Sequence, residues 1–164
     1  MIASSICVWL FLLTISTILG ICNANWSDGS VCSSLIVLKN SGTFSSPVGS
    51  DGQYPSGLKC AWSLTVQPIH VIQLTFSKFE LEQSLNCEDG DYVIVYNGES
   101  SRNDPLATIC GENAKPIFST TSKMIVEFIS NDKIERSGFT ANFKTVDQSA
   151  AACASGRGPL NLTD

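Results

Sequence analysis

The chain after residue 60 is built from short runs in which apolar and polar residues alternate. In the first of them Trp62, Leu64 and Val66 form one apolar face, with Ala61, Ser63 and Thr65 between them. A spacing of two places such residues on one side of a β-strand. Runs of this kind cover 61–66, 72–76, 124–128 and 139–143. Helical periodicity is absent there, so these runs predict strands.

One run differs, because Tyr92, Ile94 and Tyr96 alternate with two valines instead of polar residues. We therefore expect 92–96 to be a strand buried on both faces or nearly so. Turn-forming residues separate the predicted strands, at 46–47, 54–57, 67–68, 88–91, 97–98 and 103–105. Short strands with frequent turns predict an all-β fold, an antiparallel β-sandwich.

An immunoglobulin domain is the obvious alternative sandwich. It would place a tryptophan well after the first core cysteine and a tyrosine two residues before the second. Here Trp62 follows Cys60 by two residues, and no cysteine follows Tyr92 at the required spacing. The immunoglobulin interpretation is therefore poor.

The N-terminal pattern is unlike the rest of the chain. Residues 6–21 are nearly all apolar, and no charged residue precedes Asp28. This run is shorter than the roughly 20 residues of a membrane-spanning helix, and the small residues ending at Ala24 are typical of a secretory signal peptide. We expect residues 1–24 to be removed and 25–31 to form a short N-terminal segment; the alternative is an uncleaved anchor. Either way the remainder enters an oxidising compartment, so the predicted location is secreted or extracellular.

Composition narrows the function. The chain has 164 residues, which predicts one domain, or one domain and a fragment of another. With Lys+Arg 10 against Asp+Glu 15, a net charge of −5 and no basic run, we expect no nucleic-acid partner and no membrane insertion of the mature module.

The residues expected of common enzymes are missing from the sequence. The only histidine is His70, and neither a G-x-S-x-G nor an H-E-x-x-H motif occurs. Glu80 and Glu82 share a strand face, but no insert that would form a glycosidase cleft accompanies them. We expect a non-catalytic protein.

Seven cysteines are present, and two of them leave with the predicted leader. Because no C-x-x-C pair occurs, disulfides are more plausible than a zinc site. Four cysteines before residue 145 allow three pairings, and the fifth, Cys153, is left over. Two glycosylation sequons begin at Asn25 and Asn161 and agree with secretion.

Several motifs follow Cys32 in a distinctive order: Gly42–Pro47, Tyr54-Pro55, Cys60-Ala61-Trp62, Leu74–Glu82, Cys87, Asp91–Gly98, Cys110-Gly111, Val126–Ser130 and Gly138-Phe139. Together they resemble the CUB domain family over residues 32–145. The resemblance implies a jelly-roll-type β-sandwich with disulfides Cys32–Cys60 and Cys87–Cys110. Residues 146–152 have the composition of a linker, and 153–164 resemble the segment after Cys32. We expect a second, truncated CUB domain to begin at Cys153; the alternative is a disordered tail with one stray cysteine.

Carboxylates are concentrated between residues 80 and 91, at Glu80, Glu82, Glu88, Asp89 and Asp91. Like charges held close together repel, and Ca²⁺ prefers six to eight oxygen ligands that include carboxylates. A solvated acidic loop without an ion is the alternative.

Resemblance to calcium-binding CUB domains implies which residues would hold the ion. Glu82, Asp91 and either Asn131 or its neighbour Asp132 would supply side-chain oxygens, and Tyr54 would brace the carboxylates through its hydroxyl. Asp91 lies four residues after Cys87, one more than is usual in the family, so Gly90 must absorb an insertion.

The same resemblance implies that the ion orders acidic loops so that a free carboxylate grips a Lys or Arg of an extracellular partner. Glu88, Asp89 and Asp91 are the candidate ligand-binding residues, although the first two are also typical turn residues. Two other functions stay open: a secreted glycan-binding protein like the single-CUB spermadhesins, or the non-catalytic arm of a tolloid-like or complement-type protease.

Overall fold

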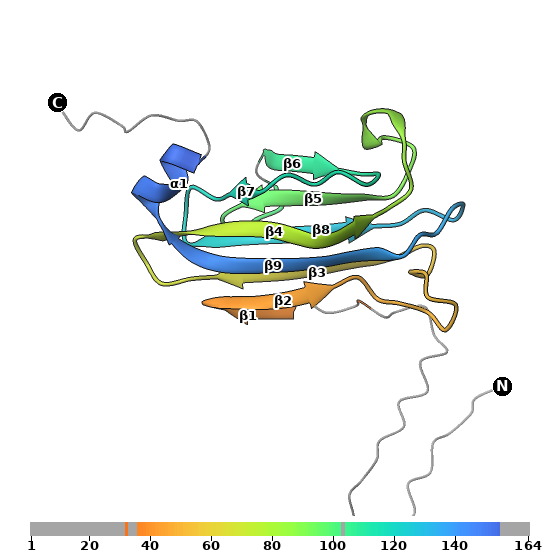
Figure 1. Ribbon diagram of the computed structural model, residues 1–164, viewed down its shortest axis with the longest axis horizontal. Helices are drawn as coiled ribbons and strands as arrows, with labels where there is room; N and C mark the ends of the chain where they lie inside the picture. Colours follow the sequence, from red (N-terminus) through yellow and green to blue (C-terminus); the bar gives the residue numbers. More distant parts are fainter. Residues whose placement is uncertain (1–31, 33–35, 103, 155–164) are drawn as a thin grey trace, which may run out of the picture.

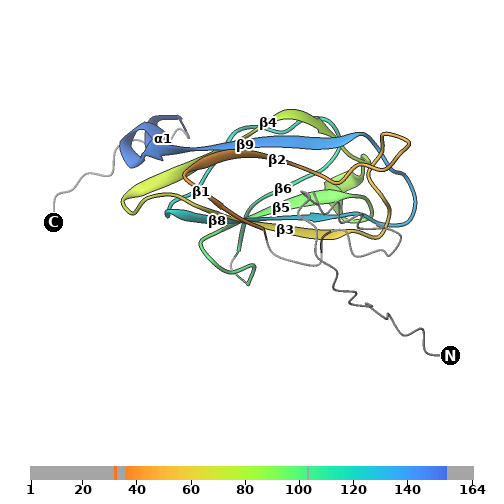
Figure 2. The ribbon, with the colours of Figure 1, turned by 90° about the horizontal axis from the view of Figure 1, so that it is seen from below.

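The computed structural model describes residues 32, 36–102 and 104–154. Two β-sheets pack face to face (Figures 1 and 2). The five-stranded sheet has the order β1-β3-β8-β5-β6, formed by Ile36–Lys39, Lys59–Thr65, Lys123–Ile129, Tyr92–Asn97 and Pro105–Ile109. The four-stranded sheet has the order β2-β9-β4-β7, formed by Ser41–Ser45, Gly138–Asp147, His70–Glu80 and Ile117–Phe118. The predicted all-β sandwich is confirmed.

Neighbouring strands in the sheets are antiparallel, except that β1 runs parallel to β3. The longest ladder joins β4 to β9 and contains one irregularity, between Phe76 and Lys78. At one end of the sandwich β4 ends, β5 begins and β8 ends. The loops that follow or precede these strands therefore meet at that end, on the right of Figure 1.

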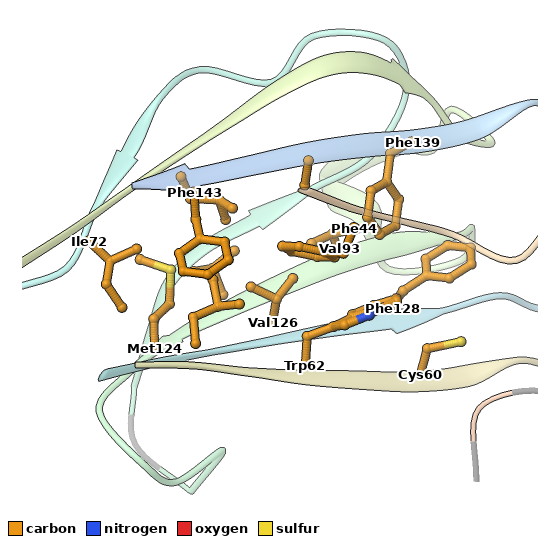
Figure 3. Close-up of a cluster of buried hydrophobic side chains, with 14 of the residues drawn as sticks. Phe44, Cys60, Trp62, Ile72, Val93, Met124, Val126, Phe128, Phe139 and Phe143 are labelled. Atoms are coloured by element: carbon orange, nitrogen blue, oxygen red, sulfur yellow. The ribbon is translucent and has the colours of Figure 1, made fainter. Parts of the chain in front are cut away.

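Apolar side chains from the two inner faces form one core (Figure 3). Trp62 and Phe128 come from the five-stranded sheet, and Phe44 and Phe139 come from the four-stranded sheet. Their rings meet across the interface, with centroids 5.6 Å apart for Phe128–Phe139 and 5.0 Å apart for Phe44–Trp62. Aromatic pairs in such edge-on or tilted arrangements stabilise a core beyond their burial of apolar area.

Two disulfides close the fold, Cys32–Cys60 and Cys87–Cys110, which is the pairing that the CUB resemblance implies. The second bridge joins the short 3₁₀ helix Leu85–Cys87 to the residue after β6. It therefore holds the loop before β5 against the end of the β5–β6 hairpin. Cys153 is exposed and carries no disulfide.

Strand β5 is only partly as predicted. Val93 and Val95 are fully buried in the core, whereas Tyr92, Ile94 and Tyr96 on the opposite face are only half-buried. The four-stranded sheet covers the face that carries Val93 and Val95. The face that carries Tyr92, Ile94 and Tyr96 points away from that sheet, so the core does not explain why it is apolar.

The C-terminal residues continue the strand and then form a helix. Strand β9 extends to Asp147, and helix α1 follows directly over Gln148–Ala154, with Ala151 buried. Residues 146–152, which the sequence assigns to a linker, thus lie in regular structure. The second CUB domain expected from Cys153 stays a prediction.

Several sequence-based predictions fall outside the described residues: the leader 1–24, the segment 25–31 and both sequons, at Asn25 and Asn161. Among the helices that the structure describes, none has the length and apolar character needed to cross a bilayer.

Candidate calcium site

Two loops at one end of the sandwich bring Tyr54, Glu82 and Asp91 together. Tyr54 lies between β2 and β3, Glu82 follows β4, and Asp91 directly precedes β5. The Tyr54 hydroxyl donates to Asp91 Oδ2 at 2.5 Å and accepts from the backbone N–H of Glu82 at 3.1 Å. One side chain therefore fixes both acidic residues.

Asn131, in the loop after β8, ties the same two residues together from the other side. Its backbone N–H donates to Asp91 Oδ1 at 2.6 Å, and its side-chain Nδ2 donates to Glu82 Oε2 at 2.7 Å. Nδ2 also donates to the carbonyl of Asp89 at 3.0 Å. The predicted residues Tyr54, Glu82, Asp91 and Asn131 thus form one hydrogen-bonded cluster.

Three of the four residues of the cluster are almost completely buried, and Asn131 is half-buried. Tyr54 and Asp91 are each 1% exposed, and Glu82 is 7% exposed. Burial raises the pKa of the Asp91 carboxyl, against the hydrogen bonds from Tyr54 and Asn131, and the negative charges of Glu82 and Glu135 raise it further. Burial and the hydrogen bond to Asp91 also raise the pKa of Tyr54, so its hydroxyl is protonated at neutral pH.

The backbone of the loop before Asp91 packs closely against the cluster. A Cβ on Gly90 would lie 2.8 Å from Ser84 Cβ and 3.2 Å from Glu82 Oε2, so a larger residue would displace the carboxylate. Asn86 and Cys87 hold left-handed backbone angles, with φ of 58° and 60°. The glycine and the Cys87–Cys110 bridge together allow this loop to lie against Glu82.

The chemistry of the donor set fits a calcium ion. Glu82 and Asp91 supply carboxylates, Asn131 supplies an amide oxygen if its side chain turns, and Asp89 supplies a carbonyl, all of which Ca²⁺ accepts. The Ser84 hydroxyl, beside Gly90, is a buried oxygen without a hydrogen-bond partner. Within the described part of the chain no three Asp, Glu, His or Cys side chains group tightly enough to hold a metal. An ion here would therefore also need carbonyl or water ligands.

The remaining predicted site residues lie at the rim. Asp132 is exposed, and so are Glu88 and Asp89. Glu80 is bonded through its carboxylate to the Ser137 hydroxyl instead of facing the cluster. The sequence left Asn131 and Asp132 as alternatives, and the structure brings Asn131 into contact with both carboxylates.

Two residues of this end were missed. Glu135 acts on Asp91 through its charge, and Ser84 contributes the unpartnered hydroxyl. Glu135 is four residues beyond Asn131 in a polar loop, and nothing in the sequence marks it as a neighbour of Asp91. Ser84 lies three residues before Cys87 in an acidic stretch, and a serine is equally typical of any surface loop.

Comparisons with known proteins agree on one family. A family model described as CUB domain matches residues 32–143. Human tolloid-like protein 1 is 38% identical over 106 residues, which are 64% of this chain and 10% of that protein. Human procollagen C-endopeptidase enhancer 1 is 36% identical over 129 residues, 77% of this chain and 28% of that protein.

A solved structure described as the MASP-1 CUB2 domain bound to Ca²⁺ superposes on this fold with a TM-score of 0.57. It covers 69% of this chain and 98% of that chain at 21% identity, so it speaks for the fold alone. The chain spans only about a tenth to about a quarter of the length of the two relatives, which are larger proteins.

Proposed function

This chain belongs to the CUB domain family, and we propose that it is an extracellular, non-catalytic protein-binding module whose acidic end, organised by Ca²⁺, grips a basic side chain of its partner. One observation carries the proposal. Glu82 and Asp91 are almost completely buried at the end of the sandwich, where Tyr54 and Asn131 hold both of them.

The free-energy cost of burying the Glu82 and Asp91 carboxylates close together supports the proposed ion. Two carboxylates placed close together in a partly dry site repel each other, and burial alone disfavours their charged forms. The raised pKa of Asp91 reflects that cost. A divalent cation between the carboxylates would reverse it, and Asn131, which now donates to Glu82, would turn its amide oxygen toward the ion.

The exposed rim supplies the contact with the partner. Glu88 and Asp89 lie in the loop that Asn131 holds through the carbonyl of Asp89. An ion that orders this loop in advance lowers the entropy that binding must otherwise cost. Asp91, at 1% exposed, acts through the ion and its hydrogen bonds instead of touching the partner.

The first experiment measures Ca²⁺ binding by titration calorimetry at millimolar Ca²⁺. We expect heat with the wild-type protein and none with Glu82→Gln, which keeps the shape but removes the charge. Glu112→Gln is the matched control, because Glu112 is exposed and makes no described contact with the cluster. Heat of equal size in wild type and Glu82→Gln contradicts the proposed ion site.

The second experiment uses a glycine peptide with one central lysine, and the same peptide with glutamine in its place. The lysine peptide should bind in Ca²⁺ and lose most of its affinity in chelator or in the double variant Glu88→Gln, Asp89→Asn. Equal binding of the two peptides contradicts the proposed grip on a basic side chain.

Glycan binding is a second candidate, favoured by the outward face of the four-stranded sheet. Thr43 donates to Asn142 Oδ1 at 2.8 Å, Asn142 Nδ2 donates to Ser77 at 3.2 Å, and the Ser45 and Thr140 hydroxyls lie 3.1 Å apart. Such a surface of hydrogen-bonding hydroxyl and amide side chains suits hydroxyl-rich ligands. Binding on a glycan array in chelator, lost in Asn142→Lys, would favour this function.

A further inference from the structure

The outward faces of the two sheets differ in chemistry. The four-stranded sheet follows the usual pattern, apolar inside and polar outside. Strands β8 and β5 of the five-stranded sheet do not, because, besides Lys123 at the start of β8, one carboxylate and five apolar or aromatic side chains point away from the core. These six residues, which we call the tyrosine face, are Tyr92, Ile94, Tyr96, Ile125, Glu127 and Ile129.

The strand register places Glu127 at the centre of the tyrosine face. Glu127 lies directly opposite Ile94, while Tyr92 is opposite Ile129 and Tyr96 is opposite Ile125. Both tyrosines are therefore diagonal neighbours of the carboxylate, within reach of long side chains. The pKa of Tyr96 is raised by burial and then by the charges of Glu127 and Tyr92, which agrees with their closeness.

The Glu127 carboxylate has no partner of opposite charge. The ion pairs within the described residues are His70–Asp147 and Lys123–Glu99, so Lys123, on the same strand, is engaged elsewhere. Lys59 lies diagonally across on β3, beyond ion-pair distance. The sheet that carries the tyrosine face forms the underside of the sandwich in Figure 2, and the four-stranded sheet covers its other side.

We propose that the tyrosine face is a second docking surface, which binds an extended partner segment carrying an arginine between two apolar residues. The guanidinium would pair with Glu127 and lie against the rings of Tyr92 and Tyr96. Arginine suits this position better than lysine, because its planar group stacks on aromatic rings and pairs with a carboxylate through two hydrogen bonds.

The spacing of the face sets the sequence of the segment. Its three rows, at residues 92, 94 and 96, are two residues apart on β5, which is about 7 Å. Alternate residues of an extended peptide repeat at the same distance. An apolar-x-Arg-x-apolar segment therefore places its arginine over Glu127 and its apolar residues over the two outer rows. Tyrosine and arginine are also, with tryptophan, the residues enriched among those that dominate interface energies.

The test uses acetyl-Leu-Thr-Arg-Thr-Leu-amide, followed by amide chemical shifts in nuclear magnetic resonance. The titration is done in chelator, so that the acidic end is not organised by Ca²⁺ and a failure of the proposed calcium function does not affect the result. Shifts should concentrate at residues 92–96 and 125–129. The peptide with glutamine for arginine should bind at least about tenfold more weakly, as expected for loss of a charge-assisted contact.

Three variants complete the design. Glu127→Gln should weaken the arginine peptide about tenfold, and Ile94→Lys should abolish its binding by placing a like charge beside the arginine. Glu112→Gln removes an exposed carboxylate that belongs to neither surface and should leave the affinity unchanged. No binding up to millimolar peptide, equal binding to Glu127→Gln, or loss of binding in Glu112→Gln overturns the proposal. Concentration-dependent dimerisation that Ile94→Lys abolishes would also overturn it, since a second copy would then cover the face.

Discussion

The Tyr54 hydroxyl offers a sharp test of the candidate site, because a single oxygen bridges two buried acidic residues. Tyr54→Phe removes the 2.5 Å hydrogen bond to Asp91 and the acceptor for the Glu82 N–H. The ring stays, so the edge-on contact with Phe128, with centroids 5.2 Å apart, is kept. The change in stability then reports on the hydroxyl alone.

The expected loss in free energy of unfolding follows from the polar groups that Tyr54→Phe leaves without a hydrogen-bond partner. A hydrogen bond to a charged group contributes about 1.5–3 kcal/mol, and a buried N–H without an acceptor costs about 1–3 kcal/mol. Relaxation around the smaller ring recovers part of this. We expect Tyr54→Phe to lower the free energy of unfolding by about 2–4 kcal/mol, which is about 6–15 °C in Tm for a domain of this size.

The assay is urea unfolding followed by tryptophan fluorescence, in chelator and again in millimolar Ca²⁺. Tyr96→Phe is the matched control, because the Tyr96 hydroxyl lies outside the core, and its loss should change stability by less than about 0.5 kcal/mol. If Ca²⁺ binds the cluster, the deficit of Tyr54→Phe should be larger in Ca²⁺ than in chelator. A Tyr54→Phe protein as stable as the control would refute the view that this hydroxyl supports the buried carboxylates.

Further predictions concern the loop, the bridge and the outward tyrosine. Gly90→Ala would place a methyl group 2.8 Å from Ser84 Cβ and should cost about 1–3 kcal/mol by overpacking. A melting temperature within about 1 °C of wild type would contradict this. Replacing Cys87 and Cys110 by alanine opens a loop of sequence separation 23 and should lower stability by about 3 kcal/mol in urea unfolding. The pKa of Tyr96 is raised in the folded state, so folding favours the protonated hydroxyl. The stability that comes from this preference is complete below the unfolded pKa of about 10, and it is lost as the pH rises through the folded pKa. Wild type should therefore lose stability relative to Tyr96→Phe at strongly alkaline pH, and parallel curves would contradict the shift.

The sequence predicted the sandwich well because its signal is local. In β3, every second residue from Cys60 to Leu64 enters the core, and the pattern of alternation is the same pattern that the pleat imposes. Strand pairing is different in kind. The parallel placement of β1 beside β3 and the irregularity near Phe76 depend on contacts between distant segments, which alternation does not encode.

In the candidate site, too, the local sequence pattern predicts some residues, and contacts between distant segments determine the others. Glu82 and Asp91 were predicted because their spacing from Cys87 resembles a known family. The choice between Asn131 and Asp132 stayed open, since it depends on a backbone N–H that donates to Asp91 across 40 residues of sequence. No side-chain pattern carries that information.

The Cys87–Cys110 bridge has a mechanical consequence. It links the acidic loop, immediately before β5, covalently to the residue that follows β6. The open end of the β5–β6 hairpin is therefore held closed. Tension applied by a partner at Glu88 or Asp89 therefore cannot peel β5 from β6 one hydrogen bond at a time. The load instead runs along β5 as shear, against ladders to both β6 and β8 whose bonds must fail together. A module built in this way would resist pulling through the acidic loop, where we propose that the partner binds.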